Sequence, residues 1–155
     1  MTDDGILMRL ALDEASAAAD RRDPGFGAVV ARAGQIVARA SSTEVTHRNP
    51  LAHDGHAVLG EACRRLGSSD LSGCTFYGTA EPCPMCSAAL LQTRIGRIVL
   101  GASGSALADL LGPRALLIED LAVDYAVQPQ VERGLESEAG LAILARSLTD
   151  HPSEH

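Results

Sequence analysis

A strand-like run, a short apolar helix and a second strand-like run follow one another in residues 74–101, and this order constrains the fold most. "CTFYGT" and "RIVLG" are rich in β-branched and aromatic residues, and between them Pro84 begins the run "PMCSAALLQ". A helix that connects two strands of one sheet makes a right-handed crossover, so the two strands run parallel. The sequence therefore predicts an α/β fold with a partly parallel sheet.

The rest of the chain extends this pattern with helical and strand-like segments. Asn49-Pro50 is typical of a helix start, and Gly67 is typical of a helix end. The further elements that we expect are a helix over 3–21, a hairpin of 26–32 and 35–41, helical pieces over 104–124 broken at Gly112-Pro113, a strand at 125–128 and a helix over 135–148.

Length and composition predict one domain over residues 1–148, with a disordered tail over 149–155. The 155 residues are 46% hydrophobic and 21% charged, as in ordinary globular domains. The net charge of −7 makes nucleic acid an unfavourable partner, since such binding depends on clustered cations. The sequence has neither a signal peptide nor a membrane-spanning apolar run, so we expect a cytoplasmic protein.

The Cys83-x-x-Cys86 pair has the spacing of two metal ligands. Because Pro84 lies between them at a helix start, both sulfurs project from a helix N-terminus, where free N–H groups favour thiolate. Thiolate is the form that binds zinc. The remaining cysteines, Cys63 and Cys74, are expected to be buried small hydrophobic residues.

His53 lies in the first turn of the helix that we expect to begin at Asn49-Pro50. Parallel strand–helix units would bring this helix start and that of Cys83 to one edge of the sheet. Three nitrogen and sulfur ligands would leave a fourth position open for water, which is typical of a catalytic zinc site. The alternative is a buried, inert cysteine pair and a surface histidine.

With these residues in place, the chain resembles the cytidine deaminase superfamily, whose zinc motif is H-x-E followed by P-C-x-x-C. It is most similar to the guanine deaminase and tRNA-adenosine deaminase branch, through "PGFGAVVARAGQIVARA", "NPLAH" and "CTFYGTAEPCPMCSAALLQTRIGRIVLGAS". The resemblance implies a three-layer α/β/α fold with a central mixed sheet of about five strands. It also implies a Zn²⁺ ion held by His53, Cys83 and Cys86, and a homodimer.

The family's catalytic Glu aligns with Gly55, because H-x-E falls on His53-Asp54-Gly55. In the family this Glu moves protons between the attacking water and the substrate, a contribution of roughly 10²–10⁴-fold in rate. Asp54 is the leading substitute, although one helical step turns its side chain by about 100°. His56 is second, at i+3 from His53, where it could act as a base or as a fourth metal ligand, and its alternative is a packing or interface role.

Two further substitutes for the missing carboxylate remain open. Glu81 directly precedes the Pro-Cys motif, where the family uses an acid to support the loop by hydrogen bonds. A carboxylate or amino group of the substrate itself could also occupy the space beside Gly55. We expect that space to be open to water, with one titratable side chain pointing into it.

The substrate side also departs from the family pattern. Ser42 stands where the family often places an Asn that holds the substrate ring, and a hydroxyl offers fewer donors than an amide. Phe26 matches the family Phe beside the pocket. We therefore predict a zinc-dependent hydrolytic deaminase of a small amino-substituted heterocycle with a changed proton shuttle. The alternative is an inactive zinc-binding pseudoenzyme that serves in ligand binding or assembly, and tRNA editing is disfavoured by the net charge.

Overall fold

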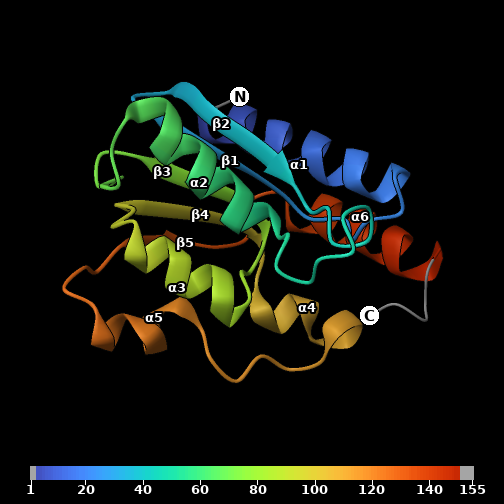
Figure 1. The fold of residues 1–155 in the computed structure, drawn as a ribbon. Coiled ribbons are helices and arrows are strands. Elements are labelled where there is room, and N and C mark those ends of the chain that lie inside the picture. The colour runs from blue at the N-terminus through green and yellow to red at the C-terminus, as the bar shows by residue number, and fades with distance from the viewer. Residues whose placement is uncertain (1–2, 151–155) are drawn as a thin grey trace.

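The computed structural model describes residues 3–150. Within this range the elements alternate between helices and strands along most of the chain (Figure 1). They are α1 (Asp3–Asp20), β1 (Gly27–Arg32), β2 (Gln35–Ser41), α2 (Asp54–Leu66), β3 (Thr75–Ala80), α3 (Pro84–Gln92), β4 (Arg97–Ala102), α4 (Gly104–Leu111), α5 (Ile118–Leu121), a 3-10 turn (Ala122–Asp124), β5 (Gln130–Glu132) and α6 (Ser137–Asp150).

Five strands of residues 3–150 form one mixed sheet in the order β2-β1-β3-β4-β5. Strand β1 pairs antiparallel with β2 and with β3, whereas β3–β4 and β4–β5 are parallel pairs. Helices α2 and α3 cover one face and α1 and α6 cover the other, so the structure has three layers (Figure 1). The predicted three-layer α/β/α fold is confirmed.

Apolar side chains fill the space on both faces of the sheet. Val30, Phe76 and Ile98 contribute to the cluster beneath α2 and α3. Their chain neighbours Val29 and Tyr77 point to the opposite face and pack against α1. Because successive residues of a strand alternate between faces, a strand covered on both sides reads as a continuous apolar run.

The direction of the strands gathers several helix starts at one edge of the sheet. Strands β2 and β3 run the same way, since each is antiparallel to β1, and β4 runs parallel to β3. Helices α2, α3 and α4 follow these three strands in the chain. Their N-termini therefore lie at the carboxyl edge of the sheet, where ligands commonly bind in α/β folds.

The predicted start of the second helix was wrong by about one turn. Asn49 accepts a hydrogen bond from the N–H of Leu51 through its side chain at 3.0 Å, and Arg48 has a left-handed φ of 50°. These contacts form a tight turn, which Asn favours as strongly as it favours a helix cap. Helix α2 begins at Asp54 with His53 as its N-cap, and it ends at the predicted Gly67, whose φ is 63°.

The last strand and the last helix also differ from the sequence-based expectation. Strand β5 is Gln130–Glu132 rather than 125–128, because Tyr125 follows the 3-10 turn and packs against the core. Helix α6 continues to Asp150, so residues 149 and 150 of the expected tail are helical. Residues 151–155 lie outside the described residues. Among residues 3–150, no helix is both long and apolar enough to cross a membrane.

Candidate metal centre and adjoining cavity

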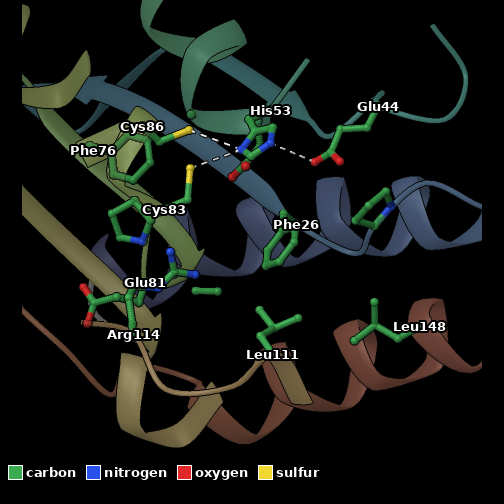
Figure 2. Close-up of a pocket in the computed structure, with 15 residues that line it drawn as sticks. Phe26, Glu44, His53, Phe76, Glu81, Cys83, Cys86, Leu111, Arg114 and Leu148 are labelled. Atoms are coloured by element: carbon green, nitrogen blue, oxygen red, sulfur yellow. Dashed lines mark hydrogen bonds and ion pairs between the residues drawn. The ribbon is translucent and has the colours of Figure 1, made fainter. Parts of the chain in front are cut away.

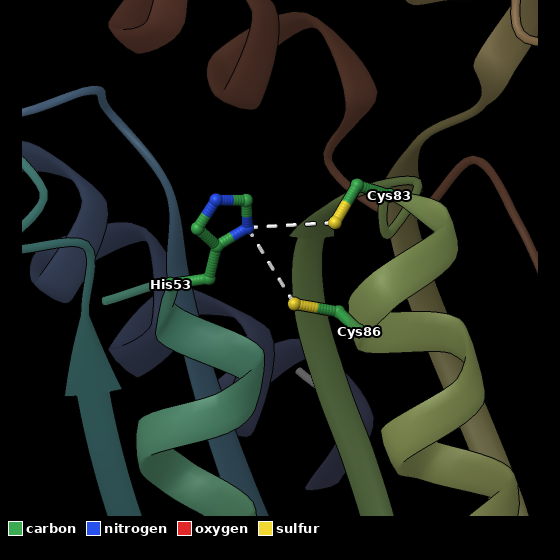
Figure 3. Close-up of side chains that lie close together, drawn as sticks. All are labelled: His53, Cys83 and Cys86. Carbon is green, nitrogen blue, oxygen red and sulfur yellow. Dashed lines mark hydrogen bonds between the residues drawn. The ribbon is translucent and has the colours of Figure 1, made fainter. Parts of the chain in front are cut away.

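His53, Cys83 and Cys86 converge at the starts of α2 and α3 (Figure 3). The His53 Nδ1 atom is 3.4 Å from the Cys83 Sγ atom and 3.6 Å from the Cys86 Sγ atom. One potential ligand atom of each residue lies within 4.8 Å of the other two. The structure thus brings the three predicted ligands together, with His53 and Cys83 each at the N-cap of its helix.

The two cysteines at the start of α3 shift each other's pKa in opposite directions. A hydrogen bond from the Cys86 thiol stabilises the Cys83 thiolate, so the pKa of Cys83 is lowered to about 3. The same hydrogen bond holds the proton on Cys86 and raises the pKa of that thiol. Pro84 occupies the first helical position and supplies the fixed backbone angle for this helix start.

Glu44 contacts the other nitrogen of the His53 ring, on the side away from the cysteines (Figure 2). The Glu44 Oε1 atom is 3.0 Å from the His53 Nε2 atom. A carboxylate at this nitrogen holds a proton on Nε2, so Nδ1 is the nitrogen available to a metal ion. The hydrogen bond with Cys83 and the charge of that thiolate raise the pKa of His53, and the charge of Glu44 raises it further.

Sequence reasoning missed Glu44, because its contact with His53 depends on how the connection between β2 and α2 folds. Buried Asp23 holds this connection by accepting hydrogen bonds from the Val45 and Thr46 N–H groups, both at 2.9 Å. The Thr46 hydroxyl donates a third at 2.6 Å. The sequence shows that an acid follows the strand, but nothing in the sequence of the loop indicates that this acid contacts His53.

Asp54, Gly55 and His56 follow His53 in the first turn of α2 and lie in different environments. Asp54 lines the cavity beside the three converging side chains, and burial raises its pKa to about 6. His56 is exposed and lines a separate surface depression with Leu59, outside this cavity.

Gly55 is buried and lines the cavity, but the space at its Cα atom is narrower than the sequence suggested. A Cβ atom added to Gly55 would lie 3.1 Å from both the Sγ and the Cβ atoms of Cys86. The expectation of open space beside Gly55 is therefore wrong at the Cα atom itself, because the Cys86 side chain lies against it.

The cavity has a volume of about 200 Å³ and largely apolar walls (Figure 2). Phe26, predicted to contact the substrate, forms one wall, and Leu111 and Leu148 form another. Ser42, the other predicted contact, is fully buried outside the cavity, and its hydroxyl donates to Glu44 at 3.4 Å. The polar side chains of the lining are those of Glu44, His53, Asp54, Glu81, Cys83, Cys86 and Arg114.

Glu81 borders the cavity with its carboxylate already engaged. Its Oε1 atom accepts hydrogen bonds from Arg133 at 2.8 Å and from the Gly104 N–H group at 3.1 Å. Its Oε2 atom accepts a second hydrogen bond from Arg133 at 3.2 Å. This arrangement ties the start of α3 to the start of α4, which supports the structural role of Glu81 over a catalytic one.

Cys63 and Cys74 lie away from the converging ligands. Cys74 is buried, Cys63 is half-buried, and both pack in the apolar cluster beneath α2 and α3. Burial raises the pKa of both thiols, which favours the neutral form. Their environment therefore agrees with the predicted role as small hydrophobic residues.

Comparison with known proteins places this site in a family. Residues 1–102 match the cytidine and deoxycytidylate deaminase zinc-binding region, and the chain belongs to this zinc-binding family. The tRNA-specific adenosine deaminase of Bacillus subtilis (strain 168) is 40% identical over 102 residues, which are 66% of this chain. These residues span 63% of that relative's length.

Solved structures of other proteins share this fold. A structure from studies of A-to-I editing by tRNA:A34 deaminases at the wobble position of transfer RNA has a TM-score of 0.79 and 33% identity. The match spans 90% of this chain and 99% of the solved chain. A guanine deaminase from Nitrosomonas europaea, at 24% identity, shares the fold with a TM-score of 0.81 over 94% of this chain and 84% of its own.

Proposed function

We propose that this protein is a zinc-dependent deaminase that hydrolyses a C–N bond of a small amino-substituted heterocycle. The observation that carries this proposal is the convergence of His53, Cys83 and Cys86 beside a cavity that Asp54 also lines. In such a reaction water replaces the amino group, and the products are a carbonyl compound and ammonia.

The donor set fits a zinc ion. One imidazole nitrogen and two sulfurs within 4.8 Å of one another match the ligands that zinc prefers, and the Cys83 thiolate is already favoured. A zinc ion held by these residues would supply a Lewis acid that makes water a better nucleophile near neutral pH. Glu44 would keep the His53 ring in the orientation that directs Nδ1 at the metal.

We assign the proton transfer to Asp54, with Gly55 standing at the position of the family's catalytic Glu. The Asp54 carboxylate lines the cavity directly after His53, so it can accept a proton from the attacking water and return it to the leaving amine. His56 is the weaker candidate, because it is exposed and lies outside the cavity.

A small-molecule substrate is favoured over a polymer. The cavity of about 200 Å³ is smaller than the pockets that hold drug-sized ligands, roughly 300–1,000 Å³. The net charge of −7 opposes binding to RNA phosphates. Because the chain is similar to tRNA-specific adenosine deaminase, RNA is the main alternative substrate. The homodimer that the family resemblance implies is also part of this proposal.

A zinc-binding pseudoenzyme is the second candidate, favoured by the contact between Gly55 and Cys86. Any side chain at position 55 would place its Cβ atom 3.1 Å from the Cys86 sulfur, so a Glu fits there only if the Cys86 side chain shifts by a few tenths of an ångström. In this case the fold and metal would be kept for ligand binding or assembly.

The deciding experiment measures ammonia release from a panel of amino-heterocycles, with zinc content determined for every variant. We expect Asp54→Asn to lower the rate by roughly 10²–10⁴-fold while zinc content stays unchanged. His56→Ala is the matched control and should keep the rate. If wild type releases no ammonia from any compound but Gly55→Glu does, the protein is a pseudoenzyme.

A further inference from the structure

Arg114 is a cationic side chain that borders the cavity from the connection between α4 and α5. Gly112, with a left-handed φ of 82°, and Pro113 precede it and fix the path of the backbone. The residue is half-buried, and Figure 2 shows its guanidinium directed into the cavity toward Cys83. No other Lys or Arg side chain lines this cavity among residues 3–150.

The Arg114 guanidinium has no acidic partner among the described residues. Glu81, which borders the same cavity, is engaged by Arg133. By contrast, Arg97 is also half-buried and contacts both Asp4 and Glu132. The other arginines of residues 3–150 that lack an acidic partner are exposed, and they are Arg22, Arg32 and Arg48.

An unpaired guanidinium in a partly apolar cavity is costly unless a ligand completes its hydrogen bonds. Removing a charge from water is unfavourable without a partner, and the planar guanidinium offers several N–H groups that match two oxygens of one oxyanion. Asp54 and Glu44 also line the cavity, so an anionic ligand would be repelled unless a cation opposed them.

We propose that Arg114 binds an oxyanion of the substrate, a carboxylate or a phosphate, while the amino group to be removed lies at the His53–Cys83–Cys86 end of the cavity. The inference rests on the proposed function and narrows its substrate to a heterocycle that carries an acidic substituent. A cavity of about 200 Å³ has room for one ring and such a group, so both can contact the protein at once.

The test uses ring-sized probes that differ in charge, added to the zinc-loaded full chain and followed by NMR titration. Benzoate and phenyl phosphate are the anionic probes, and benzamide is the neutral match. We expect Arg114→Gln to lower the affinity for at least one anionic probe by roughly tenfold or more and to leave the affinity for benzamide unchanged. Arg114→Lys should recover part of the affinity, and Arg48→Gln, at an exposed and unpaired arginine, should have no effect.

The result also distinguishes the kind of oxyanion and the source of a failure. Loss of benzoate binding alone indicates a carboxylate, and loss of phenyl phosphate binding alone indicates a phosphate. The proposal is overturned if Arg114→Gln affects benzamide equally or changes no probe. An anticodon stem-loop RNA serves as a further probe, and the proposal is also overturned if the variant weakens the binding of this RNA alone. If the protein releases ammonia from a neutral heterocycle and Arg114→Gln does not change that rate, the proposed function is supported and this inference is contradicted.

Discussion

Cys83 and Cys86 are positioned by the start of one short helix, whereas His53 is positioned by contacts between distant parts of the chain. In α3 the N-cap, the proline at the first helical position and the second sulfur lie within four consecutive residues. At α2 the His53 ring is held by Glu44, and the loop that carries Glu44 is held by Asp23. Local sequence therefore positions the cysteine half of the site, Cys83 and Cys86. Tertiary contacts position the histidine half, His53.

This difference predicts how each half responds to change. A ligand pair on a single helix start keeps its geometry as long as the helix forms, because few other segments determine it. A ligand oriented by a loop depends on every contact that orders the loop. We therefore expect the cysteine half to be sensitive at the ligands themselves, and the histidine half to be sensitive at residues that never touch the metal.

Cys86→Ala should have the largest effect, because it removes a ligand from the locally built half. We expect zinc to be lost from the purified protein, since one thiolate and one imidazole hold the ion too weakly. Metal content by mass spectrometry is the measurement. Cys63→Ala, on a half-buried cysteine away from the site, should keep the metal, and the opposite pattern would contradict the ligand assignment.

Glu44→Ala should have the next largest effect and tests the histidine half. Without the carboxylate at Nε2, the imidazole loses its fixed tautomer, and zinc affinity should fall by roughly 10–100-fold. Glu44→Gln should be milder, because its amide oxygen can still accept the hydrogen bond. Competition with a chelator gives the affinity, and nitrogen NMR of the imidazole reports the tautomer.

The control for Glu44 is Glu61→Ala, which removes an acid of α2 that pairs with Arg64 and Arg65 instead of His53. It should leave zinc affinity unchanged. Equal affinities for Glu44→Ala and wild type would show that Glu44 does not orient the ligand, and the contrast between the two halves would disappear.

Gly55→Ala should have the smallest effect, and it probes the contact between the two halves. The added methyl would meet the Cys86 sulfur at 3.1 Å, so zinc affinity should fall a few-fold while the stability of the zinc-free protein changes little. Gly60→Ala is the matched change in the same helix, with nothing within 4 Å of the new Cβ atom. It should raise the free energy of unfolding by about 0.5–1 kcal/mol without affecting zinc.

For both glycine variants, urea denaturation of the zinc-free proteins gives the free energy of unfolding, and chelator competition gives the zinc affinity. If Gly55→Ala stabilises the protein as much as Gly60→Ala and keeps full zinc affinity, then the Cys86 side chain moves freely. The two halves would then be less closely packed than the structure indicates.

The sequence predicted the parts of this protein that depend on neighbouring residues. The apolar runs around Pro84 indicated the parallel crossover and the cysteine helix start, and Gly67 indicated the end of α2 through its left-handed backbone. The same local signals failed at Asn49, because Asn stabilises a turn as readily as a helix cap and the choice depends on the loop around it.

By itself, the sequence determined the α/β class, the approximate positions of the elements and the residues able to bind a metal, because periodicity and helix-start chemistry act over a few residues. Tertiary structure decided which partner each of these residues meets. Folding brought Glu44 to the His53 ring, placed the Cys86 sulfur against Gly55, left His56 exposed and directed Arg114 into the cavity. Such contacts join residues that are distant in the chain, and their distances depend on how the helices and loops pack on the sheet.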